Sequence, residues 1–437
     1  MHEDGGGKVI SLGFDAAPWK HAGRMKIRTL VFVMFAGMSG SLRAYDFGNG
    51  FSLSVSYIGE IMADVSGGTS TGVIAEGSLE VLANIDMDKA FGWRGTTLHA
   101  SLMYPHGTSL TTAHTGDFSV VSSIDAYDSV RLYEAWADQT FLDSGLSLRA
   151  GFLAADVDFA VMGMAAPLVN STFGAPFVLT GNFAMSTYPY SALGLRLGVE
   201  PVPGWNMKLG VYDGNVAPGV FHDPTPGASP SNEFNKHGIH FALRRHEGAM
   251  LFGEIEWEKP GLHDVAVKFG AVYHTDRFGA IYNATSATLK SRQLPRDAPG
   301  FGGNYAFYII VERELWHERD TEHDGFGIFA RVVVAPEDRN FFPWSAEIGL
   351  AYRGLFQSSA ADNLAVGIAG IGISSKARDA YYDADLRAPK DEFIVEATYQ
   401  YALNTWCTLQ PDVQWVIHPG GTAGGAVVIG FRTTVVF

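Results

Sequence analysis

The chain has 437 residues, of which 51 are glycine, 13% are aromatic and only 18% are charged, and its mean hydropathy is +0.06. Hydropathy this close to zero excludes a bundle of transmembrane helices, and the aromatic and apolar content excludes an intrinsically disordered chain. The net charge of −15 argues against nucleic-acid binding, which requires a basic surface to neutralise phosphates.

The first feature in chain order is a short apolar stretch, residues 30–38, which follows Lys26 and Arg28 and precedes small residues ending at Ala44. A membrane-spanning helix needs about 20 residues, so this stretch is too short to span. Basic residues, a short apolar core and then small residues are the order of a secretory signal peptide, although Leu42 stands where a small residue is preferred. A short buried helix is the alternative interpretation.

We therefore predict that residues 1–44 are an upstream extension and a signal peptide, with Met25 as the expected start, and that residues 45–437 form one mature domain. Residues 1–44 hold more basic than acidic residues, so the mature chain is more acidic than the precursor. Its single cysteine, Cys407, means that the exported fold is held together without an internal disulfide.

Along the rest of the chain, apolar and polar residues alternate over segments of about ten residues that are bounded by Gly, Pro, Asn or Asp. In residues 97–104, Leu98 and Leu102 share one face, while His99 and Ser101 share the other. The same alternation is found in residues 191–200, 207–212, 393–401 and 427–437. The last of these ends on a terminal phenylalanine, a feature that resembles the final strand of bacterial outer-membrane proteins.

The length of these segments and the charges on their polar faces favour a transmembrane β-barrel over a soluble all-β sandwich, which is the alternative. A bilayer demands that every backbone group be paired and that no strand edge remain, which sustained β pattern across the whole domain can satisfy. The sequence therefore predicts an all-β fold, a transmembrane antiparallel β-barrel with long extracellular loops that fold into the pore.

The strand count is set by a parity rule. Segment by segment we find about 17 candidate strands, whereas a single-chain barrel with both ends in the periplasm needs an even number. Treating residues 238–258 as one crossing leaves about 16. The short connections then share one side: residues 88–94, 141–145, 201–205, 259–263, 317–324 and 403–405. The long ones share the other: residues 106–128, 157–190, 214–237, 276–303 and 374–390. Porins have this arrangement of short periplasmic turns and long outer loops.

Short pieces of sequence spread over most of the mature chain carry a family resemblance by their order and spacing. They are residues 116–117, 121–122, 131–139, 148–156, 170–174, 210–214, 335–340, 409–414 and 418–421. Together they resemble the OprB family of carbohydrate-selective porins. Ser123 stands where that family more usually has asparagine, and Phe152 where it more usually has glutamine. These two departures concern the preferred sugar rather than the fold.

The resemblance implies a sixteen-stranded barrel in the bacterial outer membrane, with a pore that is narrowed by inward-folded loops and favours sugars such as glucose. It also implies that residues 157–190 are the pore-narrowing loop. This segment carries Asn170, Ser171 and Thr172, which are uncharged hydrogen-bonding residues, and local capping within the loop is the alternative role for each of them.

The predicted inner face carries charges on four adjacent strands. If Tyr133, Ala135 and Ala137 face lipid, then Glu134, Trp136 and Asp138 face the lumen, and by the same alternation Arg149, Arg196 and Lys208 point inward at similar depth. An Arg or Lys on the lipid face at mid-membrane costs about 2–4 kcal/mol, so the energetics alone require this placement.

The candidate substrate-binding residues at the constriction are Arg131, Glu134, Trp136, Arg149, Asn170, Arg196 and Lys208. Trp136 beside Glu134 would offer an apolar face to a sugar ring while charged partners meet its hydroxyls, a common mixture in ligand sites. A generic hydrated wall, in which the charges satisfy one another, is the alternative interpretation of these residues.

We find no HExxH, GxSxG or Cys/His cluster with metal-ligand spacing, so we expect neither an enzyme nor a cofactor. An outer-membrane lipase with a Ser–His pair is the enzyme alternative. The leading prediction is passive diffusion of small carbohydrates through a water-filled lumen. A general or anion-biased porin is the second prediction, and a plugged barrel that serves as an adhesin or envelope anchor is the third. The sequence leaves both a monomer and a homotrimer open.

Overall fold

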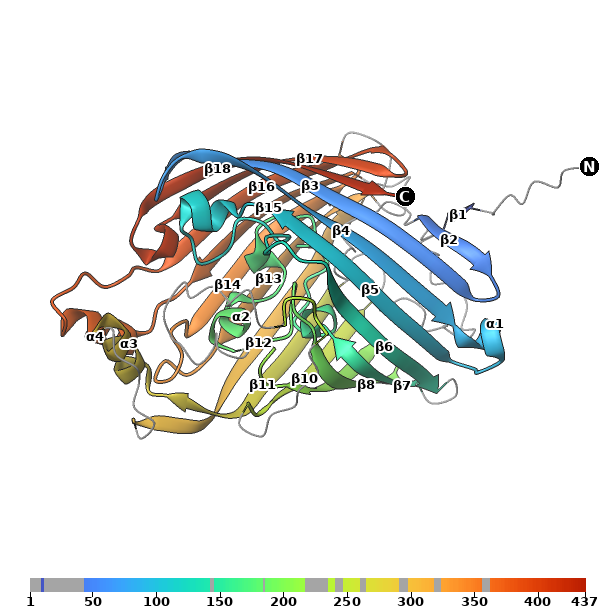
Figure 1. The fold of residues 1–437 in the computed structure, drawn as a ribbon, viewed down its shortest axis with the longest axis horizontal. Coiled ribbons are helices and arrows are strands. Elements are labelled where there is room, and N and C mark those ends of the chain that lie inside the picture. The colour runs from blue at the N-terminus through green and yellow to red at the C-terminus, as the bar shows by residue number, and fades with distance from the viewer. Residues whose placement is uncertain are drawn as a thin grey trace, which may run out of the picture.

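The computed structural model describes residues 9–11, 43–141, 145–183, 185–216, 235–239, 247–259, 265–290, 298–317, 324–355 and 362–437. Within these residues, the sixteen strands β3 to β18 form one closed antiparallel barrel, in which each strand pairs with the next and β18 pairs with β3 (Figure 1). In chain order they are β3 (Phe51–Gly68), β4 (Gly72–Asp86), β5 (Thr96–Gly107), β6 (Arg131–Phe141), β7 (Leu146–Leu153), β8 (Ala192–Val202), β9 (Trp205–Asp213), β10 (Ala249–Lys259), β11 (Val265–Gly279), β12 (Gly300–His317), β13 (Gly325–Val334), β14 (Trp344–Arg353), β15 (Asn363–Ile371), β16 (Glu392–Asn404), β17 (Cys407–Ile417) and β18 (Gly424–Val436). The predicted fold class is confirmed.

Two short strands lie outside the barrel ring. β2 (Arg43–Gly48) pairs with the first residues of β3, beyond the point where the β18 ladder ends, and so covers an edge that closure leaves open. β1 (Val9–Ser11) pairs with β2. Most of the expected signal peptide and the expected start at Met25 fall outside the described residues, so cleavage after Ala44 stays a prediction.

The alternation in the sequence corresponds to the two faces of the wall. On β5, Leu102 and Tyr104 are exposed on the outer face, while His99 and Ser101 are buried on the inner face. The outer face is bounded near both ends by aromatic side chains. On the side of the short turns these are Trp93, Phe141, Trp205, Trp316, Trp406 and Phe437, and on the side of the long loops Tyr104, Tyr273, Tyr305, Phe393 and Trp415. An apolar band between two aromatic girdles is the surface that a bilayer surrounds.

The connections predicted to be short lie on one side of the barrel and those predicted to be long lie on the other, although the β3–β4 connection on the long-loop side is only residues 69–71. Within residues 238–258 the described part contains one barrel strand, β10, and a turn at residues 235–238 lies before it; the closed barrel has sixteen strands, which confirms the merged count. Helices of the described residues occur only in connections: α1 (Met87–Phe91) in a short turn, and α2 (Phe177–Asn182), α3 (Ile281–Leu289) and α4 (Ser375–Tyr382) in long ones. Figure 1 shows α3 and α4 at one end of the barrel and α1 and the C-terminus at the other. None of the described helices is long and apolar enough to cross a membrane.

One register prediction is wrong. Ser101 on β5 pairs with Glu134 on β6, but the next residue, Leu102, pairs with Leu132, so Tyr133 is an extra residue in the ladder. Such a bulge reverses the alternation beyond it. Tyr133 is therefore buried on the inner side and packs near Met103 instead of facing lipid.

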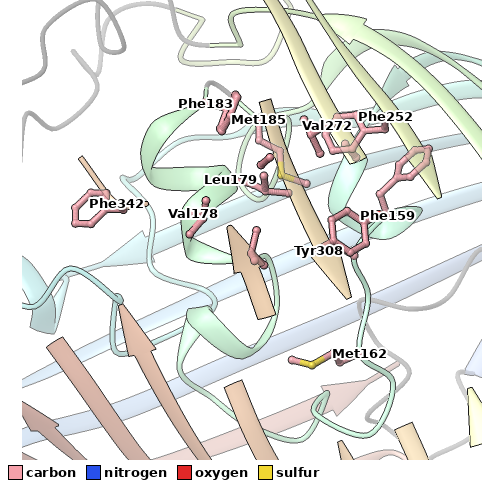
Figure 2. Close-up of a cluster of buried hydrophobic side chains, with 14 of the residues drawn as sticks. Phe159, Met162, Val178, Leu179, Phe183, Met185, Phe252, Val272, Tyr308 and Phe342 are labelled. Carbon is pink, nitrogen blue, oxygen red and sulfur yellow. The ribbon is translucent and has the colours of Figure 1, made fainter. Parts of the chain in front are cut away.

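The connection between β7 and β8, residues 154–191, runs through the inside of the barrel. Its apolar side chains pack against inward-facing side chains of the wall and form the main apolar cluster of the molecule. Figure 2 shows Phe159, Leu179, Phe183 and Met185 of this connection beside Phe252, Val272 and Tyr308 of β10, β11 and β12. We call residues 154–191 the internal segment. The predicted inward-folded loop is thus confirmed.

Candidate functional site

The internal segment is held across the lumen by carboxylates of the wall. Backbone N–H groups of the segment donate to these carboxylates on strands that lie far apart around the barrel. The pairs are Ala154 with Glu134 (3.0 Å), Ala160 with Glu254 (2.9 Å), Met164 with Glu312 (2.6 Å), Asn170 with Glu396 (3.0 Å) and Val169 with Glu396. Each of these N–H groups finds its hydrogen-bond acceptor on the wall rather than within the segment, so these contacts fix the path of the segment.

Arg331 of β13 provides the opposite chemistry. Its guanidinium donates to the carbonyl oxygens of Ala160 (2.9 Å), Thr172 (2.7 Å) and Gly174 (2.7 Å) and forms an ion pair with Glu347 of β14 (3.1 Å). Both charged side chains are fully buried. Arg331 and Glu347 were not among the candidates from the sequence. The alternation of β13 and β14 indicates that both side chains face the lumen. Alternation alone does not tell which inward-facing charged side chain contacts a loop.

Arg149 and Arg196 lie directly opposite each other on β7 and β8, as the predicted inward ladder requires. Both guanidinium groups contact the same two carboxylates, Asp138 of β6 and Asp158 of the internal segment, at 3.0–3.5 Å. The four groups form a compact buried network that joins the wall to the segment. The residue that faces Arg149 across the ladder is Asp138, whereas Glu134 lies four residues away along β6.

Lys208 of β9 extends this network. Its ammonium group contacts Glu254 (3.1 Å) and Glu256 (3.6 Å) of β10 and donates to the backbone oxygen of Asp158 (3.0 Å). On the far side of β10, Lys268 of β11 pairs with Glu256 at 2.9 Å. The basic side chains of this part of the wall are therefore neutralised by carboxylates, and their combined field on a passing ion is small.

Trp136 is buried between two neighbours. The His99 ring from β5 stacks on it with centroids 4.5 Å apart, and the Arg149 guanidinium from β7 lies 4.1 Å from its ring centroid. Since β5 and β7 lie on opposite sides of β6, these groups occupy opposite faces of the indole. The expectation that Trp136 presents a free face to a sugar ring does not fit this geometry.

Asn170 is fully buried at a turn of the internal segment. Its side-chain oxygen accepts from Thr172 N (3.1 Å), and its amide donates to Gln414 of β17 (3.0 Å). The local capping role is therefore present, together with an anchor to the wall. Nearby, Gln410 donates to the Pro167 oxygen (2.7 Å), so the pieces of sequence that carry the family resemblance meet where the segment crosses the lumen.

The connection between β5 and β6 also enters the barrel. Phe118 and Ser119 donate their N–H groups to Glu392 of β16, which also accepts from Gly420 N (2.8 Å). Arg432 of β18 donates to Ser123 Oγ (3.1 Å) and pairs with Glu60 of β3. Ser123, one of the two departures from the family pattern, thus has a structural partner in the wall.

Arg131 is the remaining candidate, and the bulge at Tyr133 turns it inward. It is 2% exposed, and its Nη1 donates to the hydroxyl of Tyr127 (2.7 Å). Its guanidinium carbon lies 4.6 Å from the ring centroid of Tyr190. Arg131 is therefore separate from the network of Arg149, Arg196 and Lys208. In the described part of the chain, no group of three or more His, Cys, Asp or Glu is placed to hold a metal ion.

Comparison with known proteins agrees with this architecture. Residues 70–437 match the carbohydrate-selective porins of the OprB family. The protein belongs to this family. The chain is 23% identical to Porin B of Pseudomonas aeruginosa over 418 residues, which cover 89% of this chain and 88% of that protein.

Two solved structures of OprB from Pseudomonas putida share the fold. The structure at high pH superposes with a TM-score of 0.76 at 18% identity, covering 89% of this chain and 94% of that one. The structure at low pH gives a TM-score of 0.53 at 15% identity, with 89% and 93% covered. The protein is thus an outer-membrane porin, a channel rather than an enzyme.

Proposed function

We propose that this porin lets neutral sugars of about the size of glucose cross the outer membrane by passive diffusion. The observation that carries the proposal is the internal segment, which narrows the lumen and is tied to the wall from β6, β10, β12, β13 and β16. A path narrowed by a fixed segment selects solutes by size and by the polar groups along it. Membership of the OprB family supports carbohydrates as the substrate class.

In this proposal Glu134, Asn170, Arg149, Arg196 and Lys208 set the width of the path by positioning the internal segment. Because Arg149, Arg196 and Lys208 are paired with carboxylates, this group of basic side chains does not attract anions strongly, which suits an uncharged solute. The same pairing argues against the anion-biased porin, the second prediction from the sequence. Trp136 acts through its stack with His99 and Arg149 and holds Arg149 in place.

The apolar cluster between the internal segment and the wall is the one observation that favours a plugged barrel with an anchoring role. Such a barrel would hold its segment in the same way but would pass no solute. Transport measurements separate the two functions directly.

The experiment is uptake of labelled D-glucose into proteoliposomes that contain the purified porin, beside a neutral dipeptide of similar size. We expect saturable glucose uptake that exceeds the flux of the dipeptide. Equal fluxes of glucose and the dipeptide would contradict sugar selectivity and indicate a general porin. No flux of either solute would indicate the plugged barrel. In the Arg149→Ala variant, Asp138 and Asp158 lose a cationic partner, so we expect a shift towards cation conduction together with altered glucose flux.

Self-association as a homotrimer is a further part of the proposal. On the outer face of β3 and β5, Tyr57 and Tyr104 surround His106, and the Tyr57 hydroxyl lies 3.3 Å from its Nε2. A histidine is an unusual side chain to face lipid, and contact with a second barrel would cover it. Mass measurement in detergent tests this, and a monomer for the wild type would contradict it.

Export through the signal peptide within residues 1–44 completes the proposal. N-terminal sequencing of the protein from outer membranes tests it, and we expect a mature chain that begins close to residue 45. A mature chain that still contains residues 30–38 would contradict it.

A further inference from the structure

Arg131 occupies an unusual position among the inward-facing arginines. It is the first residue of β6, at the side of the long loops, and the bulge at Tyr133 turns it into the lumen. Its guanidinium lies against two phenol rings, with the carbon 4.6 Å from the Tyr190 centroid and 5.7 Å from the Tyr127 centroid. The two rings are 6.2 Å apart and inclined by 45°.

The other buried arginines of the barrel wall are neutralised. Arg149, Arg196, Arg331 and Arg432 each form an ion pair with a buried carboxylate. Among the described residues, no carboxylate forms an ion pair with Arg131, and its buried Nε has no hydrogen-bond partner. A buried cation without a counter-charge is costly, and its ring contacts compensate only part of that cost.

The surroundings of Arg131 combine a cation with amphipathic rings. Tyr127 and Tyr190 are each partly exposed and lie beside the buried guanidinium. Tyr190 stands at the end of the internal segment, just before β8, and Tyr127 stands just before β6. Solutes from outside therefore reach this cluster before they reach the network of Arg149, Arg196 and Lys208.

We infer that Arg131, Tyr127 and Tyr190 form an outer subsite for sugar acids, hydroxylated carboxylates of the size of glucose. A guanidinium presents its donors in a planar fork that matches a carboxylate, and the buried Nε of Arg131 has no hydrogen-bond partner among the described residues. The phenol rings offer apolar faces to the C–H groups of the sugar, and their hydroxyls can bond its hydroxyls. The inference rests on the proposed function for the diffusion path, and it adds a substrate class that the neutralised inner network does not favour.

The experiment measures uptake of labelled D-gluconate, D-glucose and acetate into proteoliposomes that contain the full porin. The Arg131→Gln variant removes the charge, and the Tyr190→Ala variant keeps the charge but removes one ring. The matched control is Arg339→Gln, because Arg339 also lies over aromatic rings, 3.9 Å from the Phe301 centroid, but is paired with Asp338 (2.8 Å). Heat-modifiable migration on gels verifies that each variant forms the barrel.

We expect Arg131→Gln to raise the half-saturating concentration of gluconate by about tenfold or more, the loss of one charge-assisted contact, while that of glucose changes by less than about twofold. Tyr190→Ala should raise the value for gluconate by a smaller factor, and Arg339→Gln should leave it unchanged. If the Arg131→Gln variant does not form the barrel, the Arg131→Lys variant tests the same inference. Lysine keeps the positive charge but lacks the planar fork of donors that matches a carboxylate.

An unchanged value for gluconate in Arg131→Gln would overturn the inference. Equal losses of uptake for gluconate and glucose would also overturn it, because they would mean that the substitution narrows the pore for both solutes. Equal losses of uptake for gluconate and acetate would overturn it as well, because they would mean that Arg131 attracts any anion. A wild type that passes gluconate saturably but not glucose would contradict the proposed function and leave the subsite standing.

Discussion

At the scale of single residues, the position of Cys407 follows from its place in β17. It pairs with Val435 of β18 and shares the outward parity of Val413 and Trp415, close to the short turn that precedes β17. The side chain is only 8% exposed. Outward parity agrees with the register expected from the sequence.

We therefore expect Cys407 to react slowly with a charged, membrane-impermeant thiol reagent in intact cells. The comparison is Asp379→Cys in a chain that also carries Cys407→Ser, because the Asp379 side chain is 55% exposed on α4. Mass spectrometry after a fixed labelling time gives the two extents of reaction. Equal and rapid labelling at both positions would show that the register or the topology is different.

Asp156 of the internal segment carries a prediction about pH. Burial raises the pKa of its carboxyl from 3.8 to about 7, although the Thr187 hydroxyl donates to it at 2.5 Å. A carboxyl whose pKa rises on folding binds its proton more tightly in the folded state, so its contribution to stability is greatest at low pH and is lost as pH rises from about 4 to about 7.

We expect the internal segment to resist proteolysis better at pH 5 than at pH 8. One such group changes the free energy of docking by at most about 1.4 kcal/mol per pH unit. Asp156→Asn keeps an acceptor for Thr187 and removes the titration, so its rate of cleavage should depend less on pH. An identical pH dependence in wild type and Asp156→Asn would assign the effect to another group.

At the scale of elements, the internal segment is positioned by contacts rather than by its own regular structure. The regular structure described within the segment is α2 and two 3-10 turns, Ala155–Val157 and Ser171–Phe173, so most of the path depends on hydrogen bonds to the wall and on apolar packing against it. Glu396 of β16 accepts from two consecutive N–H groups, those of Val169 and Asn170. Losing this acceptor leaves two buried donors unpaired, each at a cost of about 1–3 kcal/mol.

Glu396→Ala should therefore release this part of the segment while the strand ladder keeps the barrel intact. We expect a higher single-channel conductance and measurable uptake of a trisaccharide. Glu337→Ala is the control, since Glu337 is an exposed carboxylate of the β13–β14 connection whose Oε2 accepts from Ser375 Oγ (3.0 Å). Wild-type conductance in a folded Glu396→Ala variant would argue that the segment is held elsewhere.

At the scale of the whole molecule, the apolar outer band predicts how the barrel sits in a bilayer. Leu209 lies near the middle of β9 and is 60% exposed, whereas Val65 lies near the loop end of β3 and is 51% exposed. Both side chains face outward, so the two positions differ mainly in their expected depth in the bilayer.

Leu209→Arg should lower the free energy of unfolding in lipid vesicles by about 2–4 kcal/mol, and Val65→Arg by about 0–1 kcal/mol, because the cost of a lipid-facing charge depends on depth. Denaturant titration in vesicles measures both values. Equal costs at the two positions would mean that the membrane band is displaced along the barrel axis.

The sequence by itself determined the wall of this protein. Alternation with period two is a local property, so it assigned Leu102, Leu209 and Phe431 to the outer face and Ser101, Arg196 and Lys208 to the inner face. The lengths of the connections fixed which side carries the long loops, and the requirement for an even number of strands corrected the count around β10.

The tertiary structure alone decided what the inner residues touch. Asn170 meets Glu396 across 226 positions of sequence, and no local pattern encodes such a contact. The bulge at Tyr133 shifts the register by one residue, which placed Arg131 inward and made the expectation for Tyr133 wrong. Trp136 has the inward position that the sequence predicted, yet His99 and Arg149 from the neighbouring strands cover its faces. Strand parity fixes the side of the wall on which a side chain lies, whereas its partners depend on barrel closure and on the path of the internal segment.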